Sequence, residues 1–161
     1  MNFEIVELKE FSGNKAVIYS VIIDNNPLTL FDLFVEENES IFPDEIISIT
    51  DKLEIIGNFT GAREHYFKIN EGTLGDGVCA LYDIPDRNLR LYCIKYGSTC
   101  ILLGGGGYKN VRALQDNEKL KKENYLLRKI SKMITHALIE EDLKWSKDGN
   151  SFSGNLMINE D

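Results

Sequence analysis

The sequence is poor in cysteine, proline, histidine and tryptophan, and it has no long apolar run. Its 161 residues include three cysteines, three prolines, two histidines and one tryptophan. No apolar run approaches the roughly 18 residues that a bilayer span requires. The first residues, MNFEIVELKE, lack the basic and apolar stretches of a secretion signal. We therefore expect a cytoplasmic protein with no membrane segment.

The few cysteines and histidines also limit the chemistry that the sequence indicates. Cys79, Cys93 and Cys100 lie in apolar, strand-like runs, without CxxC spacing and with no histidine nearby in the sequence. Zinc sites and redox pairs usually show such spacing, so we expect buried, reduced thiols and neither a metal nor a cofactor. His65 and His136 have no partner that the sequence identifies, and no Ser–His–Asp or Cys–His signature is present.

Hydrophobic periodicity predicts an α+β fold in a single domain that spans residues 1–161. The first two strand-like runs form an N-terminal β-hairpin, and four later runs, separated by short turns, form an antiparallel meander sheet. These six predicted strands are 3–8, 15–23, 64–70, 77–84, 88–96 and 99–103.

Three helices are predicted from the 3.6-residue period and from capping signals. The first begins with Asn26 as N-cap and Pro27 at the first helical position. The second covers residues 43–57, and a long C-terminal helix covers residues 116–141, with Asp116 or Asn117 as its cap. A short hairpin-like tail follows, with a turn at Asp148 and Gly149 and with Trp145 and Phe152 expected to hold it against the body.

The net charge is −8, and the charged side chains are unevenly distributed along the chain. Residues 1–84 carry 5 basic and 16 acidic side chains, residues 85–132 carry 11 and 4, and residues 133–161 carry 2 and 6. Because binding of nucleic acid depends on clustered Lys and Arg, the middle segment indicates a surface that faces a polyanion. The alternative is an ordinary solvated helix face, and charge alone does not decide between them.

Four consecutive glycines, Gly104 to Gly107, follow the last predicted strand and precede Tyr108 and Lys109. They match neither the GxxxxGK phosphate loop nor the GxGxxG dinucleotide motif, and a meander lacks the βαβ context of either site. We expect a bent exit from the strand, because glycine adopts backbone angles that other residues avoid. A role in letting a binding partner approach the backbone stays open.

Cations and phenols recur on successive predicted strands. Alternation along residues 88–96 places Arg90, Tyr92 and Ile94 on one face of the sheet. Arg and Tyr together suit RNA, because guanidinium groups neutralise phosphates while aromatic rings stack on unpaired bases. The alternative is the ordinary polar outer face of a half-buried sheet. The candidate RNA-binding residues are Arg63, His65, Arg87, Tyr92, Lys95 and Arg112.

The order of these elements resembles the RelE/HigB superfamily of bacterial toxins, and within it a phage-derived branch. The motifs that carry the resemblance are NPLTLFDLF, HYFKINEG, LRLYCIKYG and ILLGGGGYKN. It covers residues 3–112, and residues 113–161 form a helical and tail extension. It implies a cytoplasmic endoribonuclease that cuts mRNA, commonly on the ribosome, and uses no metal. It also implies a helix-turn-helix antitoxin protein as partner. It is compatible with a homodimer of this chain.

Carried over by position, the resemblance implies that Lys68, Arg90, Tyr108 and Lys109 form the catalytic set. Lys68 and Arg90 would hold the phosphate, with Tyr108 or Lys109 as the proton carrier. Attack by a 2′-oxygen needs a base, an acid and positive charge around the phosphorane, and one hydrogen bond to developing charge contributes ~3 kcal/mol. The acidic composition, the glycine run and the extension depart from the family, so a non-catalytic protein-interaction module on the same fold is the alternative function.

Overall fold

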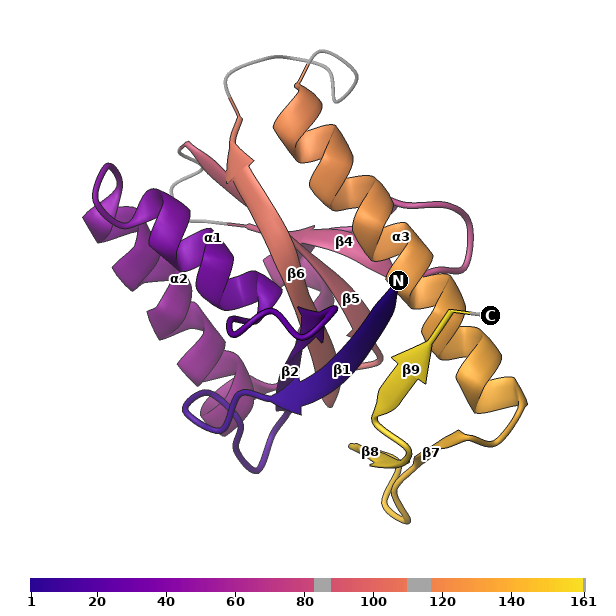
Figure 1. Cartoon of the computed structure of the whole chain (residues 1–161). Helices are drawn as coiled ribbons and strands as arrows, with labels where there is room; N and C mark the ends of the chain where they lie inside the picture. The colour runs from indigo at the N-terminus through magenta and orange to yellow at the C-terminus, as the bar shows by residue number, and fades with distance from the viewer. Residues whose placement is uncertain (83–87, 110–116, 161) are drawn as a thin grey trace.

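The computed structural model, which describes residues 1–82, 88–109 and 117–160, has an α+β fold built on a seven-stranded sheet (Figure 1). The strands are β1 (Asn2–Glu7), β2 (Val17–Ile23), β3 (Phe67–Lys68), β4 (Val78–Leu81), β5 (Leu89–Tyr96), β6 (Cys100–Tyr108), β7 (Leu143–Trp145), β8 (Phe152–Gly154) and β9 (Met157–Asn159). The helices are α1 (Leu30–Asn38), α2 (Pro43–Ile55) and α3 (Glu118–Ile139), with a π-helix η1 (Ile56–Thr60) and a 3-10 turn η2 (Glu64–Tyr66). The predicted α+β fold is confirmed. Within the described residues, no helix has the length and apolar character that a membrane span needs.

The sheet runs in the order β3-β4-β5-β6-β2-β1-β9. The predicted antiparallel meander is confirmed as β3 to β6, and the predicted hairpin as β1 and β2. The sequence did not predict how the two are joined: β2 pairs with β6 in parallel, with Val17 aligned to Cys100 and Tyr19 to Leu102. The C-terminal strand β9 then pairs with β1. Part of the predicted extension, residues 113–161, therefore forms an edge strand of the sheet.

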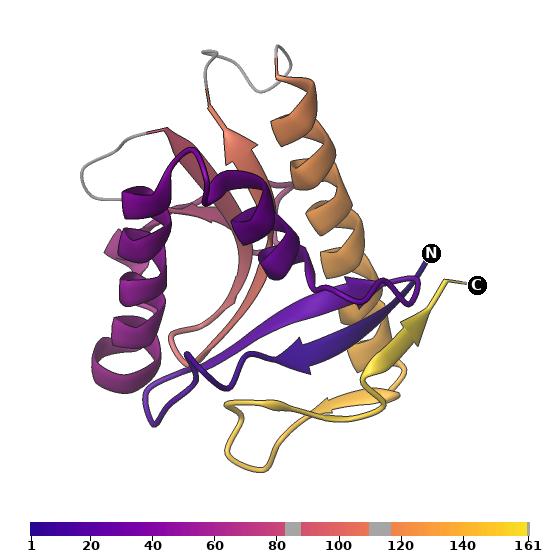
Figure 2. The same ribbon diagram turned by 60° about the vertical axis from the view of Figure 1, so that its left-hand side comes forward.

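Helices cover both faces of the sheet, α3 on one side and α1 with α2 on the other (Figures 1 and 2). On the first side, Leu127 of α3 belongs to the same buried cluster as Tyr92 of β5. On the second side, Phe34 of α1 and Leu53 of α2 share a cluster with Leu91 of β5. The alternation predicted for β5 is therefore confirmed, but the expected exposed face is not: Tyr92 is only 1% exposed, because α3 lies over it.

Two helix starts illustrate how capping decides the boundaries. The long helix begins after Asn117, one of the two predicted caps, whose side-chain oxygen accepts a hydrogen bond from the Leu120 amide at 3.0 Å. The first helix starts later than predicted, at Leu30. Thr29 is its N-cap, because Thr29 and Asp32 form a reciprocal capping box. Asn26 instead accepts a hydrogen bond from the Leu28 amide in the preceding turn.

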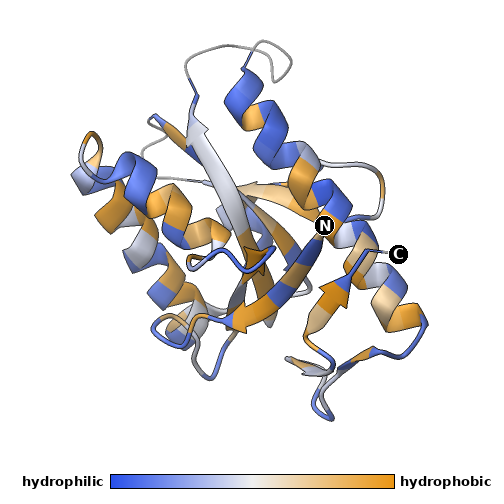
Figure 3. Cartoon of the chain, in the orientation of Figure 1, coloured by the Kyte–Doolittle hydropathy of each residue, from blue (hydrophilic) through white to orange (hydrophobic). Residues whose placement is uncertain are grey.

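The four glycines belong to β6 itself, so the predicted bent exit is wrong. Gly104 and Gly105 together oppose Tyr92 in a β-bulge between β5 and β6. A Cβ atom on Gly104 would lie 2.9 Å from a Leu127 methyl carbon of α3, and one on Gly106 would lie 1.8 Å from the Arg90 carbonyl oxygen. Because glycine has no Cβ, α3 can pack directly on the strand, and the β5 backbone can approach it closely. This half of β6 is the pale end of the strand in Figure 3.

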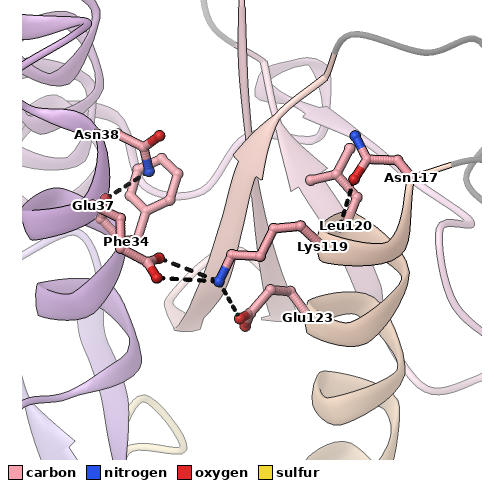
Figure 4. A network of polar contacts seen from close by, with 7 residues as sticks. All are labelled: Phe34, Glu37, Asn38, Asn117, Lys119, Leu120 and Glu123. Carbon is pink, nitrogen blue, oxygen red and sulfur yellow. Dashed lines mark hydrogen bonds and ion pairs between the residues drawn. The ribbon is translucent and has the colours of Figure 1, made fainter.

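A lysine joins the helices on either side of this glycine segment (Figure 4). The Lys119 Nζ atom at the start of α3 lies 2.9 Å from Glu123 Oε1 and 3.2 Å from Glu37 Oε1 of α1. Partial burial disfavours the charged lysine, but the two carboxylates outweigh that effect and raise its pKa. The network thus ties α1 to the first turns of α3.

The predicted hairpin-like tail is confirmed as β7 and β8, with Gly149 at positive φ in the turn. Trp145 and Phe152 stack with ring centroids 4.6 Å apart, and Phe152 also packs on Tyr19 of β2. After the tail, Glu160 forms an ion pair with Lys129 of α3 at 2.8 Å and contacts the Met1 amine. The start of the chain, α3 and β9 are therefore held together at one corner.

The three cysteines are buried and free, as predicted. Cys79 and Cys93 lie opposite each other on β4 and β5, with 3.5 Å between their sulfur atoms. The neighbouring Cys79 thiol and burial raise the pKa of Cys93 well above its usual range, and burial raises that of Cys100 to about 12. Their protonated forms are therefore favoured near neutral pH.

Replacing Gly106 by Ala should destabilise the fold by about 2–3 kcal/mol, because the added Cβ meets rigid backbone and forces β5 and β6 apart. Gly107→Ala is the matched control on the same strand, since its Cβ would come closest to the flexible Lys119 side chain at 3.1 Å and meet Leu120 at an ordinary contact distance of 3.7 Å. Urea denaturation should show a clearly larger loss for Gly106→Ala. Equal losses would contradict the close approach of the two backbones.

Replacing Glu160 by Gln should remove a pH-dependent contribution to stability. Lys129 and the Met1 amine lower the Glu160 pKa from 4.5 to about 2 in the folded chain. A lowered folded-state pKa stabilises the fold above the unfolded value and loses that effect as pH falls from about 4.5 to about 2. Urea midpoints at pH 6 and pH 2.5 should therefore differ less for Glu160→Gln than for the wild type. An identical difference in both proteins would mean that the ion pair does not form in solution.

Candidate anion-binding site

A small hollow at the ends of the meander strands is lined by three cationic side chains. Lys68 at the end of β3, Arg90 on β5 and Lys109 just after β6 line this hollow, which has a volume of about 190 Å³. The remaining lining residues are Ala80, Leu81, Tyr82 and Leu89. We call it the cationic hollow.

Strand register explains why these cations meet. Lys68 is aligned with Ala80, and Ala80 with Tyr92, so all three lie on the face that α3 covers. Arg90 is two residues from Tyr92 on the same strand and therefore shares that face. Lys109 is brought beside β5 because its amide donates a 2.7 Å hydrogen bond to the Asn88 carbonyl. Three of the four residues that the sequence assigned to catalysis thus converge.

A carboxylate that the sequence did not single out lies among these cations. Glu71 Oε1 is 3.5 Å from an Arg90 guanidinium nitrogen and 3.8 Å from Lys68 Nζ. The Glu71 carbonyl oxygen accepts hydrogen bonds from Asn124 at 2.9 Å and from Arg128 at 3.0 Å, both on α3. The extension helix therefore fixes the loop that carries the carboxylate. Two cations share one negative charge, which leaves the site with an excess of positive charge.

Several buried polar atoms around Glu71 are not hydrogen-bonded. Among the described residues, Glu71 Oε1, Asn124 Oδ1 and Arg128 Nε have no hydrogen-bond partner, although Asn124 is fully buried. Glu71 Oε1 still has its ion pairs with Arg90 and Lys68, so the usual cost of about 1–3 kcal/mol for a buried group without a partner applies to Asn124 Oδ1 and Arg128 Nε. Packing alone does not explain why several buried polar groups without hydrogen bonds lie close together. Folds tend to retain the energetic cost of such groups at binding sites.

Tyr92 is buried under α3 and does not line the cationic hollow. Burial raises its pKa, while hydrogen bonds to Arg90 and Asn124 act in the opposite direction. The prediction that this ring stacks on RNA is wrong, because a side chain that is 1% exposed offers no ring face to a base. Its hydroxyl lies near enough to Arg90 for the guanidinium charge to favour the phenolate form.

Tyr108 faces away from the cationic hollow. It is aligned with Leu89, whereas Arg90 is aligned with the neighbouring Gly107, so Tyr108 and Arg90 lie on opposite faces of the sheet. The Tyr108 ring is half exposed and packs on Phe42 beside α2, with ring centroids 5.5 Å apart. The sequence placed it in the catalytic set by position alone, and strand alternation separates it from the other three.

The other candidate RNA-binding residues do not reach the hollow. Arg63 and His65 are exposed at the 3-10 turn before β3, and the His65 ring packs on Tyr66. Lys95 lines a different hollow, and its Nζ atom donates to the Gly97 carbonyl at 2.8 Å. The predictions for Arg87 and Arg112 lie outside the described residues.

No group of three or more His, Cys, Asp or Glu side chains within the described ranges is arranged to hold a metal ion. Comparison with family models, curated proteins and solved structures gave no match. The resemblance to the RelE/HigB superfamily and the activity that it implies therefore stay predictions.

Replacing Glu71 by Gln should strengthen binding of inorganic phosphate to the cationic hollow. Gln keeps the size of the side chain but removes the charge that competes with an anion for Lys68 and Arg90. Each partly exposed ion pair contributes about 0.2–1 kcal/mol, so the Kd should fall roughly threefold to tenfold in a calorimetric or NMR titration. Glu37→Gln is the control, because its partner Lys119 lies outside the hollow. Weaker or unchanged phosphate binding by Glu71→Gln would contradict this interpretation.

Proposed function

We propose that this protein is a metal-independent endoribonuclease of the RelE/HigB toxin type, and that the cationic hollow binds the RNA phosphate that is cut. The observation that carries the proposal is the convergence of Lys68, Arg90 and Lys109 from three separate segments on one hollow. In an acidic chain with a net charge of −8, such a grouping favours a specific anionic ligand over general attraction to polyanions.

Arg90 is the residue best placed to bind the phosphate. A guanidinium group presents a planar fork of donors that matches two phosphate oxygens, and it is always charged. Its ion pair with Glu71, at 3.5 Å, keeps the guanidinium group at the hollow. Lys68 and Lys109 add charge on either side, where negative charge develops as a pentavalent phosphorane forms.

Cleavage by attack of the 2′-oxygen also requires a group that takes the hydroxyl proton. Glu71 fits this role, since its carboxylate lies within 4 Å of both cations that would hold the phosphate. Lys109 is the remaining candidate for giving a proton to the leaving 5′-oxygen. The P–O bond to the 5′-oxygen breaks as the bond from the 2′-oxygen forms, which leaves a 2′,3′-cyclic phosphate and a free 5′-hydroxyl.

The toxin assignment adds a cytoplasmic location, mRNA as substrate, in some contexts on the ribosome, and a helix-turn-helix antitoxin as the inhibiting partner. Its support is the resemblance together with the order of elements, in which a hairpin and two helices precede the meander that carries the cations. The same fold as a non-catalytic interaction module is the second candidate. It is favoured by one observation, that Tyr108 faces α2 and cannot serve as a proton carrier beside Arg90.

Arg90→Ala should abolish toxicity and RNA cleavage. Induction of the wild-type chain in a bacterial host should arrest growth and cut mRNA at defined positions. Purified protein with ribosomes and mRNA should give the same cuts. Loss of one donor to a developing oxyanion costs about 3 kcal/mol, so the cleavage rate should fall about 100-fold or more. Lys95→Ala on the same strand is the matched control and should keep the wild-type rate.

Both variants should retain the melting temperature of the wild type within a few degrees, because neither side chain belongs to the hydrophobic clusters. Normal growth and intact mRNA on induction of the wild type, with ribosomes present, would reject the nuclease and favour the interaction module. Equal losses of activity and melting temperature in Arg90→Ala would assign that arginine a structural role.

A further inference from the structure

The extension helix carries an exposed aromatic ring between two cations. Tyr125 of α3 is 50% exposed. The Arg128 guanidinium carbon lies 4.8 Å from the Tyr125 ring centroid, and Lys121 Nζ lies 5.8 Å from it. The spacing of four and three residues places these side chains on one face of the helix. An exposed tyrosine in this setting contributes nothing to the hydrophobic clusters, since it belongs to neither of them.

The two cations beside Tyr125 are not neutralised. In the described part of the chain, no carboxylate forms an ion pair with Lys121 or Arg128, whereas Lys119 and Lys129 on the same helix are paired with Glu123 and Glu160. The face with Tyr125 therefore combines positive charge with a flat apolar surface. Single-stranded nucleic acid is the ligand that fits both features, because its phosphates attract the cations and its bases stack on the ring.

A chain of direct contacts connects this face to the cationic hollow. Arg128 stacks on Tyr125 and also donates a 3.0 Å hydrogen bond to the Glu71 carbonyl. The Glu71 carboxylate in turn contacts Arg90 and Lys68, which line the hollow. A ligand whose phosphate occupies the hollow can therefore extend along the Glu71 loop to the helix.

We propose that Lys121, Tyr125 and Arg128 form a subsite for an unpaired nucleotide that flanks the bound phosphate. The Tyr125 ring stacks on the base. Lys121, the more distant of the two cations, moves off the ring and contacts a neighbouring phosphate. Arg128 stays on the ring and keeps it aligned with the Glu71 loop. The ligand class is single-stranded RNA longer than a dinucleotide. This inference rests on the proposed function, because it needs RNA in the cationic hollow.

Fluorescence anisotropy with 2′-O-methyl oligoribonucleotides tests the subsite, because these probes present RNA bases and phosphates but cannot be cleaved. The wild type should bind a labelled hexanucleotide more tightly than a dinucleotide. Tyr125→Ala should weaken hexanucleotide binding about tenfold to hundredfold, the usual effect of losing one stacked base, and leave dinucleotide binding unchanged. Tyr125→Phe, which keeps the ring, should stay within about threefold of the wild type.

Phe59→Ala provides the matched control, since Phe59 is a 73% exposed aromatic on η1, and it should bind both probes like the wild type. If the wild type binds both probes and Tyr125→Ala binds the hexanucleotide equally well, the subsite is wrong while the cationic hollow stands. If Tyr125→Ala loses both probes to the same extent, the tyrosine acts through the hollow, and the subsite is again wrong. If the wild type binds neither probe, the proposed function fails and the subsite fails with it.

Discussion

The structure depends on the close contact of the glycine half of β6 with the elements around it. Without Cβ atoms in residues 104–107, α3 packs directly on the strand, and the β5 backbone lies against it through a bulge. Lys119 then connects the first turns of α3 to α1 through Glu123 and Glu37. This contact positions Asn124 and Arg128, which hold the Glu71 loop beside the cationic hollow. The glycine run, for which the sequence predicted a bent exit from the strand, thus serves close packing of α3 and β5.

Local signals in the sequence predicted most elements and some of the site. The period of α3, its cap at one of two neighbouring residues and the alternation along β5 are properties of neighbouring residues, and all three are confirmed, with Asn117 as the cap. Alternation also placed Arg90 and Tyr92 on one face. The parallel pairing of β2 with β6 was not predictable, because no local pattern records which distant strand becomes a neighbour. The predicted bent exit at the glycine run is wrong for the same reason, because the role of these glycines depends on contacts with the distant elements α3 and β5.

The parts of the site that the sequence missed come from outside the strands. Glu71 is in a loop, and Asn124 and Arg128 are on a helix that lies outside the resemblance, so only tertiary structure brings them to the cations. Glu71 follows Lys68 by three residues, which was the one available signal, but carboxylates are too common in this chain to be informative. The burial of Tyr92 was missed because one strand cannot show that a helix will cover its polar face.

The pairing of early strands with late ones has a consequence for biosynthesis. The hairpin of β1 and β2 is translated before β6 and β9, which are its neighbours in the sheet. Until residue 159 has been made, at least one long edge of this apolar hairpin exposes unpaired amide and carbonyl groups that can template pairing with another chain. Strand pairs between residues far apart in the sequence form slowly during folding. The nascent hairpin is therefore exposed to aggregation until its neighbouring strands are made, and it is a segment where a chaperone that shields extended apolar chains should act.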